Sequence, residues 1–515
     1  MSHVAQAKRR TATIYRLVIP TKTLLILILG VMVLLVEIGH LAFLTAYPPV
    51  FIDEIWNANA AWNWLQTGIN FDSIHTRWPT LGNAPWLASF ALFGLGFFQL
   101  RLVSWVAGIC LLVATFVVGR RNYGSITGVT AALLLALSQP FLQASHYARW
   151  DIMIAALVMA AYALALVALE EDRWAAHLIG ALLIGLSLDI HLNGILFAPA
   201  LATLYLVFYQ KKVLSRAGTW LAALGGLLGI LFFVAIKIVP NPDAYFAQFN
   251  FSYAFTHKLP ISELNPLDLL ASLRAEIGRY HFFENSLDFT LIGASLAYLL
   301  VRRSKADRLL LIFTGVAFLN FVLFVGNKHD VYAILLYPFF MLMVAETMVS
   351  LVREAEMDSK QRIFAGVLLG LALFSSIVHV ARPFASHRSY DYTAITEQIR
   401  SYLPPGTRVM GRPEWWLGLA DYEYRSNLNL TYYHYQNGYT MAEAFAAVRP
   451  DFLIVDTKWR QQLVDENAYP IEPGFGVYNL PREDFDSFLT QHGQELSSFY
   501  DPVHGLFEIW AIRWD

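Results

Sequence analysis

Two adjacent carboxylates, Asp53 and Glu54, stand in the segment "YPPVFIDEIWNANAAWNWLQTG", immediately after an apolar run. A carboxylate held at a membrane surface is ionised at neutral pH and can take a proton from an incoming hydroxyl or amine. The alternative is structural, with Asp53 as the N-cap of the following helix and Glu54 in its first turn, where it complements the helix dipole. Both interpretations stay open at this point.

A second polar group lies in "ASHYARWDIM", residues 144–153, and consists of His146, Arg149 and Asp151. An ionised side chain at membrane depth costs about 2.5–3.5 kcal/mol, so such residues need a reason to be there. His146 and Arg149 are three residues apart and would share one helix face. Arg149 and Asp151 converge only if a helix starts between them. The alternative is an interfacial anchor in which Arg149 reaches toward water.

A third group, Asp189, His191 and Asn193, lies in "LDIHLNG". It is compatible with a polar turn, with a substrate contact or with a metal ligand set. A metal site needs several such ligands converging from different segments, and this spacing alone does not specify one.

A fourth group lies in "GNKHDVYAILLYP", residues 326–338. Lys328 and Tyr332 are four apart and are predicted to share one helix face. A lysine on the outer side of a membrane runs against the positive-inside trend, and a phosphate partner would explain it. The alternative is that Lys328 has only a structural role.

The composition identifies the elements that must position these groups. Of 515 residues, 57% are hydrophobic and 15% are charged, and the mean hydropathy is +0.46. These values are typical of a polytopic membrane protein. The net charge of -2 provides no bulk attraction for nucleic acid. With Cys110 as the one cysteine, a disulfide framework and a thiolate metal site are both excluded.

Apolar runs long enough to span a bilayer predict about eleven transmembrane helices. The stretch 176–209 exceeds one span and is interrupted by "LDIHLNG", so two short helices are expected there. The first run is predicted to be a signal-anchor helix. The predicted spans are 23–45, 99–119, 126–143, 152–169, two within 176–209, 218–238, 286–301, 309–326, 331–352 and 363–381.

Clusters of lysine and arginine fall on every second connection, which predicts a cytoplasmic N-terminus and an outer C-terminus. This orientation places all four polar groups on the outer side at a similar depth. We therefore divide the chain into a membrane domain, residues 1–382, with juxtamembrane helices in 46–98, and an outer domain, residues 383–515. Alternating helix and strand patterns predict a small α/β fold for the outer domain, acting as a cap or a docking surface.

The ordered series of motifs over residues 20–350 resembles the polyprenyl-phosphate-sugar-dependent membrane glycosyltransferases of the GT-C type. That class includes protein O-mannosyltransferases and lipid A aminoarabinose transferases. The resemblance implies an outward-facing cavity, a sugar donor on a polyprenyl phosphate and inversion at the anomeric carbon. The residues that carry it are "DE" (53–54), "TG" (67–68), "GNAPW" (82–86), "LRLVSWVAG" (100–108), "GRRNYGSITG" (119–128), "ALSQPFLQASHYARWD" (136–151) and "KHDVYAILLYP" (328–338).

The resemblance also implies roles for individual residues. Asp53 matches the general base and Glu54 its supporting partner. Arg149 and Asp151 match a polar pair on the cavity wall, and Lys328 matches a cation that faces the donor phosphate. The remaining candidates for substrate binding are Tyr332, His146 and His191, the last of which stands where a lysine is often expected in these relatives.

The chemistry agrees with this set. A glycosidase needs a second carboxyl as acid, whereas a polyprenyl phosphate leaves as an anion and needs cations instead. No cofactor is expected, and a divalent metal is possible but not indicated. The expected partners are the lipid-linked donor, membrane lipids and a lipid, glycan or protein acceptor, without nucleic acid. The expected location is the plasma (inner) membrane.

The main alternative is a transporter or flippase for a lipid-linked glycan intermediate. Such a protein predicts inverted repeats and helices broken at the membrane midplane. No internal repeat is visible in the sequence, and the charged residues cluster at one face. A non-catalytic scaffold that displays the outer domain is a third possibility, but it leaves the intramembrane charges without a purpose.

Overall fold

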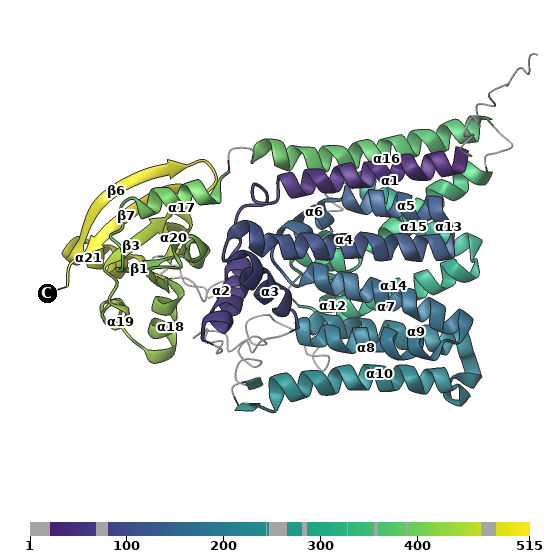
Figure 1. Ribbon diagram of the computed structural model, residues 1–515, viewed down its shortest axis with the longest axis horizontal. Coiled ribbons are helices and arrows are strands. Elements are labelled where there is room, and N and C mark those ends of the chain that lie inside the picture. The colour runs from purple at the N-terminus through teal and green to yellow at the C-terminus, as the bar shows by residue number, and fades with distance from the viewer. Residues whose placement is uncertain are drawn as a thin grey trace, which may run out of the picture.

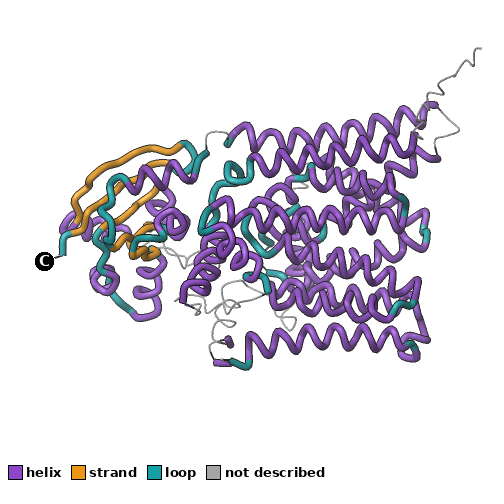
Figure 2. The backbone as a smooth tube through the Cα atoms, viewed as in Figure 1, coloured by secondary structure: helices purple, strands orange, loops and turns teal. Residues whose placement is uncertain are grey.

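The computed structural model consists of a long helical bundle with a small α/β domain at one end (Figure 1, Figure 2). We call the end of the bundle that carries this domain the domain end and the opposite end the far end. Residues 1–20, which precede the first predicted span, lie outside the described residues. The structure describes residues 21–67, 81–240, 242–243, 245–246, 265–280, 286–326, 328–354, 359–387, 390–464 and 480–514.

Helices make up the bundle. Two further helices, α2 and α3, lie between the bundle and the C-terminal domain (Figure 1). The elements are α1 (Thr21–Ala42), α2 (Ile52–Thr67), α3 (Ala84–Phe93), α4 (Phe97–Asn122), α5 (Ser125–Ala136), α6 (Gln139–His146), α7 (Asp151–Glu171), α8 (Trp174–Ile190), η1 (Leu192–Phe197), α9 (Ala198–Tyr209), η2 (Gln210–Ser215), α10 (Ala217–Phe233), η3 (Val234–Ile238), α12 (Pro266–Gly278), α13 (Ser286–Arg302), α14 (Lys305–Phe324), η5 (Asp330–Leu335), α15 (Tyr337–Glu354) and α16 (Ser359–Ser386).

Each predicted span overlaps at least one helix, and the multi-helix membrane fold is confirmed. Among the described residues, six helices are long and apolar enough to cross a membrane, or seven if a bent pair counts as one span. The exact number of eleven therefore stays a prediction. The bent pair is α5 and α6, which meet at 67° where a single span, 126–143, was predicted. The interruption at "LDIHLNG" separates α8 from η1 and α9, as expected.

Small residues allow the closest helix packing in the bundle. A side chain added at Gly185 of α8 would meet the backbone of Gly229 of α10 at 2.9 Å. A side chain at Gly119 of α4 would likewise meet Gly128 of α5 at 2.6 Å. Between membrane helices there is no water to exclude, so close van der Waals contact of this kind drives association. These glycines set the spacing of the helices that lead to the site.

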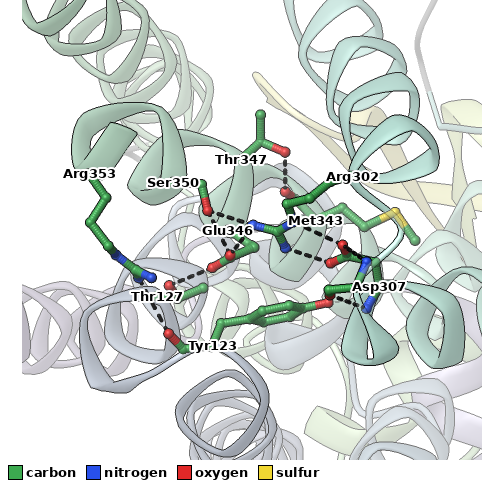
Figure 3. Close-up of polar contacts among 10 residues, drawn as sticks. Tyr123, Thr127, Arg302, Asp307, Met343, Glu346, Thr347, Ser350 and Arg353 are labelled. Atoms are coloured by element: carbon green, nitrogen blue, oxygen red, sulfur yellow. Dashed lines mark hydrogen bonds and ion pairs between the residues drawn. The ribbon is translucent and has the colours of Figure 1, made fainter. Parts of the chain in front are cut away.

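A polar cluster joins four helices at the far end (Figure 3). Arg302 of α13 binds Asp307 of α14 through two N–H···O contacts of 2.9 and 2.5 Å. It also donates to Glu346 of α15 at 2.6 Å and to Ser350 at 2.7 Å. The other oxygen of Glu346 accepts from Thr127 of α5 at 2.9 Å. These contacts pair the buried charges, so the cluster is an anchor of the bundle.

The C-terminal domain is a five-stranded mixed sheet in the order β2-β1-β3-β7-β6, covered by short helices. The predicted boundary at 382/383 falls inside α16, which continues to Ser386. The α/β fold itself is confirmed. Its elements are α17 (Tyr392–Arg400), β1 (Arg408–Gly411), η7 (Pro413–Leu419), β2 (Glu423–Ser426), α18 (Leu428–Asn437), α19 (Met441–Val448), β3 (Phe452–Asp456), α20 (Thr457–Gln462), β4 (Leu463–Val464), β5 (Leu480–Pro481), α21 (Arg482–His492), β6 (Gly493–Asp501) and β7 (Gly505–Ile512).

The two faces of this sheet belong to different cores because side chains alternate along a strand. Ile454 of β3 and Phe507 of β7 belong to the same apolar core as the bundle. Leu453 and Val455, the neighbours of Ile454 on β3, pack in a second core with Phe445 of α19. The domain is thus joined to the membrane part through one face of its sheet, which fixes its position above the bundle.

A buried histidine lies at this junction. His504 precedes β7 and is 3% exposed, with its ring 4.8 Å from the ring of Trp415 and 5.5 Å from that of Tyr390. Among the residues that the structure describes, neither ring nitrogen has a hydrogen-bond partner. Burial lowers the pKa of His504 to about 4, against an opposing effect of Asp501. The ring is therefore neutral in the folded protein at pH 7.

Acid is expected to weaken the domain through this residue. The unfolded chain protonates His504 near a pKa of 6.5, whereas the folded chain does so near 4. The stabilising contribution is thus present above pH 6.5 and is lost as the pH falls toward 4, by up to about 3 kcal/mol. In His504→Phe, the stability of the protein should depend less on pH between 6.5 and 4. Melting temperatures of both proteins from pH 7.5 to 5 would test it, and parallel curves would contradict it.

Candidate active site

The first turn of α2 carries Asp53 and Glu54, but the two carboxylates face different surroundings. α2 begins at Ile52, and Glu54 accepts a hydrogen bond at 2.9 Å from the backbone N–H of Phe51, the residue before the helix. Glu54 therefore provides the capping contact at the third helical position. The alternative with Asp53 as N-cap is wrong. The Asp53 side chain is 28% exposed, whereas that of Glu54 is fully buried.

Glu54 is held by four donors. Arg101 of α4 donates Nε to Oε1 at 2.9 Å and Nη2 to Oε2 at 2.8 Å. The backbone N–H of Ala148 donates to Oε1 at 2.8 Å, in addition to the contact from Phe51. Arg101 is itself fully buried and also donates to the carbonyl of Leu44 at 3.0 Å. A carboxylate enclosed in this way positions the chain around it and has no room for a substrate.

Asp53 instead faces Arg149, which stands in the short connection between α6 and α7. Arg149 forms an ion pair with Asp53 and donates Nε to Asp151 Oδ2 at 2.8 Å. α7 begins at Asp151, so the helix starts between the two residues, which is the condition under which they were expected to converge. Burial by itself would lower the pKa of Arg149, but Asp151 and Tyr332 outweigh it and raise the pKa above the usual value. The guanidinium is a permanent cation.

His146 does not take part in this group. α6 ends at His146, so the expected common helix face with Arg149 does not exist and that prediction is wrong. The ring of His146 is fully buried, with Nε2 3.0 Å from Nδ1 of His40 and Nδ1 2.6 Å from the carbonyl oxygen of Tyr47. These contacts join α1 to α6 behind the site. A substrate contact for His146 remains only a prediction.

Tyr332 and Lys328 contact different partners. The helical turn η5 begins at Asp330, so the expected single helix face is wrong because Lys328 precedes the helix. The Tyr332 ring lies 6.0 Å from the Arg149 guanidinium and 5.8 Å from the ring of His191. Lys328 Nζ lies 3.2 Å from Glu276 Oε2 and donates to the carbonyl of Phe321 at 2.5 Å. Tyr332 thus lies with Arg149, Asp53 and Asp151 in one cluster, which we call the Arg149 group. Lys328 belongs to another cluster.

That other group contains an arginine that the sequence reasoning missed. Arg279 follows α12, is 4% exposed and pairs with Glu276. Its Nε and Nη1 are buried and have no hydrogen-bond partner within the described part of the chain. The positive charge of Arg279 interacts electrostatically with the Tyr332 hydroxyl. Burial lowers the pKa of Lys328, and Glu276 opposes this effect. A signal was present, since Arg279 lies between the predicted spans 218–238 and 286–301, and Lys328 lies between the predicted spans 309–326 and 331–352.

The turn at "LDIHLNG" borders the Arg149 group through one residue. The His191 ring lies 6.3 Å from the ring of Trp150, and His191 Nδ1 accepts from the backbone N–H of Asn193 at 3.2 Å. Asp189 accepts from the backbone N–H of Leu81 at 2.8 Å. Within the described ranges, no three His, Cys, Asp or Glu side chains lie close enough to hold a metal ion together. The turn is polar, and His191 is its contact with the site.

Comparison with known proteins agrees with this architecture. The model of the dolichyl-phosphate-mannose-protein mannosyltransferase family matches residues 83–236, just under a third of the chain. No curated protein sequence gives a match.

Three solved structures share the fold of this chain. ArnT from Cupriavidus metallidurans, bound to undecaprenyl phosphate, is 14% identical with a TM-score of 0.59, over 94% of this chain and 97% of ArnT. The Archaeoglobus fulgidus oligosaccharyltransferase, in complex with Zn and sulfate, is 13% identical with a TM-score of 0.57, over 94% and 72% of the two chains. The archaeal oligosaccharyltransferase AglB from the same organism was solved with an inhibitory peptide and a dolichol-phosphate. It is 13% identical with a TM-score of 0.53, over 95% and 74%. The predicted resemblance to GT-C type glycosyltransferases is confirmed in the fold and in the family model.

Proposed function

We propose that this chain of GT-C fold is an inverting glycosyltransferase that moves a sugar from a polyprenyl-phosphate donor to an acceptor at the domain end of the bundle. One observation carries the proposal. A partly exposed carboxylate, Asp53, is paired with a buried permanent cation, Arg149, at the membrane-facing end of α2. The relatives that bind undecaprenyl phosphate and dolichol-phosphate support a donor of this class.

The reaction needs one base and one site for the leaving anion. Asp53 removes the proton from the attacking acceptor group, which forms a new bond to the anomeric carbon of the sugar. The bond from that carbon to the phosphate oxygen breaks, and its electron pair leaves with the polyprenyl phosphate. Because attack and departure occur on opposite faces, the configuration at the anomeric carbon inverts. The anionic leaving group needs stabilising cations instead of an acid.

Arg149 links donor binding to activation of the base. In the structure its guanidinium is divided between Asp53 and Asp151. A donor phosphate that binds Arg149 competes with Asp53 for the same donors, since planar guanidinium groups prefer bidentate oxyanions. Asp53 then loses its counterion and becomes a stronger base at the moment when the donor is in place. Arg279, with two buried guanidinium nitrogens that lack acceptors among the described residues, is a second ligand for the phosphate.

The proposed orientation places the domain end of the bundle on the outer side of the membrane. The basic residues of the far end, such as Arg121 and Arg302, belong on the cytoplasmic side of a plasma (inner) membrane by the positive-inside trend. The C-terminal domain and the Arg149 group then face outward. A lipid-linked donor suits this arrangement because its prenyl chain stays in the bilayer while the sugar reaches Asp53.

Undecaprenyl phosphate binding to the purified full-length protein tests the proposal. Arg149→Ala and Arg279→Ala should each weaken binding about tenfold or more, because a hydrogen bond to a charged group is worth about 1.5–3 kcal/mol. Lys328→Ala should weaken it less, since Glu276 and the Phe321 carbonyl already engage its ammonium group. Lys305→Ala, at the exposed far end, is the matched control and should bind normally.

The outcomes separate the alternatives. Unchanged affinity in both arginine variants would remove the phosphate role from this group. Movement of the lipid-linked donor across vesicle membranes, without formation of a glycosylated product, would favour the transporter instead.

A further inference from the structure

A cleft of about 380 Å³ lies between α2 and the C-terminal domain. One wall is the face of α2 that carries Trp56, Asn59 and Asn63, and the other is formed by η7, β2 and the start of α18. Its volume falls within the range of about 300–1,000 Å³ that is usual for small-molecule sites. None of its lining residues belongs to the Arg149 group, so the cleft is a separate compartment next to the base.

Aromatic rings form much of the lining. Trp56 and Trp62 come from α2, Trp416 from η7 and Tyr424 from β2, and all four are partly buried. The Tyr424 hydroxyl is already used, since it donates to the carbonyl of Arg412 at 2.5 Å, so its ring is the part that faces a ligand. Large flat rings with few rotatable bonds offer contact area at low entropic cost. They match the apolar C–H faces of a pyranose ring.

Amides provide the complementary polar groups. Asn59 and Asn63 lie on α2, where Asn63 Nδ2 donates to Asn59 Oδ1 at 2.9 Å, and Asn429 lies opposite on α18. A side-chain amide both donates and accepts, as does each sugar hydroxyl. The charged residues of the lining neutralise each other, because Arg425 donates to Glu423 at 3.0 Å. This neutral wall suits an uncharged saccharide better than a phosphorylated headgroup or a charged peptide.

The position of the cleft indicates which substrate enters it. Trp56 lies about 4.5 Å along the helix axis from Asp53, and Asn63 lies about 15 Å from it, at a rise of about 1.5 Å per residue. The cleft thus extends away from the base on the side of the C-terminal domain, whereas the cations Arg149 and Arg279 belong to the bundle. In an inverting reaction the attacking group approaches from the side opposite to the leaving phosphate. The cleft therefore lies on the side of the acceptor.

We propose that this cleft binds a neutral oligosaccharide and that the acceptor is a glycan whose terminal hydroxyl reaches Asp53. The proposal rests on the proposed function and names its acceptor class. The C-terminal domain then has a direct role, because it supplies one wall of the acceptor site. An extended cleft also selects for acceptors longer than one sugar, since a single ring cannot reach from Asn63 to Asp53.

Saturation-transfer NMR on the full-length protein in nanodiscs tests it, with neutral gluco-, manno- and N-acetylhexosamine oligosaccharides of two to six units as probes. At least one series should bind, with affinity rising with length. Trp416→Ala and Asn59→Ala, on opposite walls, should each weaken that binding about tenfold or more. Tyr500→Ala, at an exposed aromatic residue of β6 outside the cleft, is the matched control and should bind normally.

The proposal is overturned if no member of the panel binds or if both wall variants bind as tightly as the unchanged protein. Undecaprenyl phosphate binding, measured in the same nanodiscs, keeps the two proposals apart. If lipid binding depends on Arg149 as expected but the cleft binds no oligosaccharide, only the proposal of a glycan acceptor is refuted. Loss of that dependence would refute the proposed donor site.

Discussion

Asp53→Asn is expected to lower the turnover number by about 10²–10⁴-fold, the usual contribution of a positioned general base. Asparagine keeps the shape of the side chain but cannot accept the proton of the attacking group. The protein should still fold, because Asp53 is partly exposed and its main partner, Arg149, keeps Asp151 at 2.8 Å. Undecaprenyl phosphate should bind at least as tightly as before, since Arg149 no longer has to release a carboxylate.

Turnover at saturating donor and acceptor, compared between the unchanged enzyme and Asp53→Asn, checks this prediction. Asp151→Asn is the matched control in the same cluster, and it should change donor affinity more than the turnover number. Full turnover in Asp53→Asn would reduce Asp53 to a structural partner of Arg149.

Features that depend on local composition could be predicted from the sequence. Bilayer thickness demands long apolar segments, so hydropathy located the long apolar helices, although it joined α5 and α6 into one span. The polar interruption at residues 188–194 predicted the break between α8 and α9 for the same reason. In the C-terminal domain, the strand β3 was recognisable because a run of apolar residues between two aspartates is typical of a buried strand.

Features that depend on where a helix ends were harder to predict. His146 and Arg149 would share a face in a continuous helix, but α6 stops at His146 and the chain is extended at Tyr147. Lys328 and Tyr332 were separated in the same way by the start of η5. A shift of one or two residues in a helix end redirects every side chain beyond it, and hydropathy does not locate ends so closely.

Long-range pairing was beyond the sequence reasoning. Arg101 lies 47 residues from Glu54, within a helix that reads as an ordinary span, and nothing in its neighbours indicates a buried ion pair. Arg279 likewise comes near Tyr332 only through the packing of the bundle. A carboxylate pair such as Asp53 and Glu54 is therefore visible in the sequence. The sequence does not show which of the two is buried in an ion pair and which is accessible to a substrate.

The partner of Glu54 is expected to contribute strongly to the stability of the fold. Arg101→Leu should destabilise the protein by about 3–5 kcal/mol, because it leaves the buried carboxylate of Glu54 without its counterion. The loss is a large part of the 5–15 kcal/mol typical of folded proteins. Glu54→Gln should have a similar effect, since an amide cannot serve four donors, two of them from a guanidinium. Melting temperature and the yield of monodisperse protein in detergent measure both effects.

The double variant distinguishes a structural role from a chemical one. Removing both charges, in Glu54→Gln with Arg101→Leu, should be less damaging than the sum of the single changes, because no buried charge is then left alone. The pair holds α2, α4 and the Ala148 backbone in place. If that is its only role, the turnover of the double variant should be proportional to the fraction of the protein that is folded. A stable double variant that binds donor but does not turn over would instead give Glu54 a part in the chemistry beside Asp53. The complete burial of the Glu54 side chain argues for positioning, because a base must exchange its proton with a substrate that can reach it.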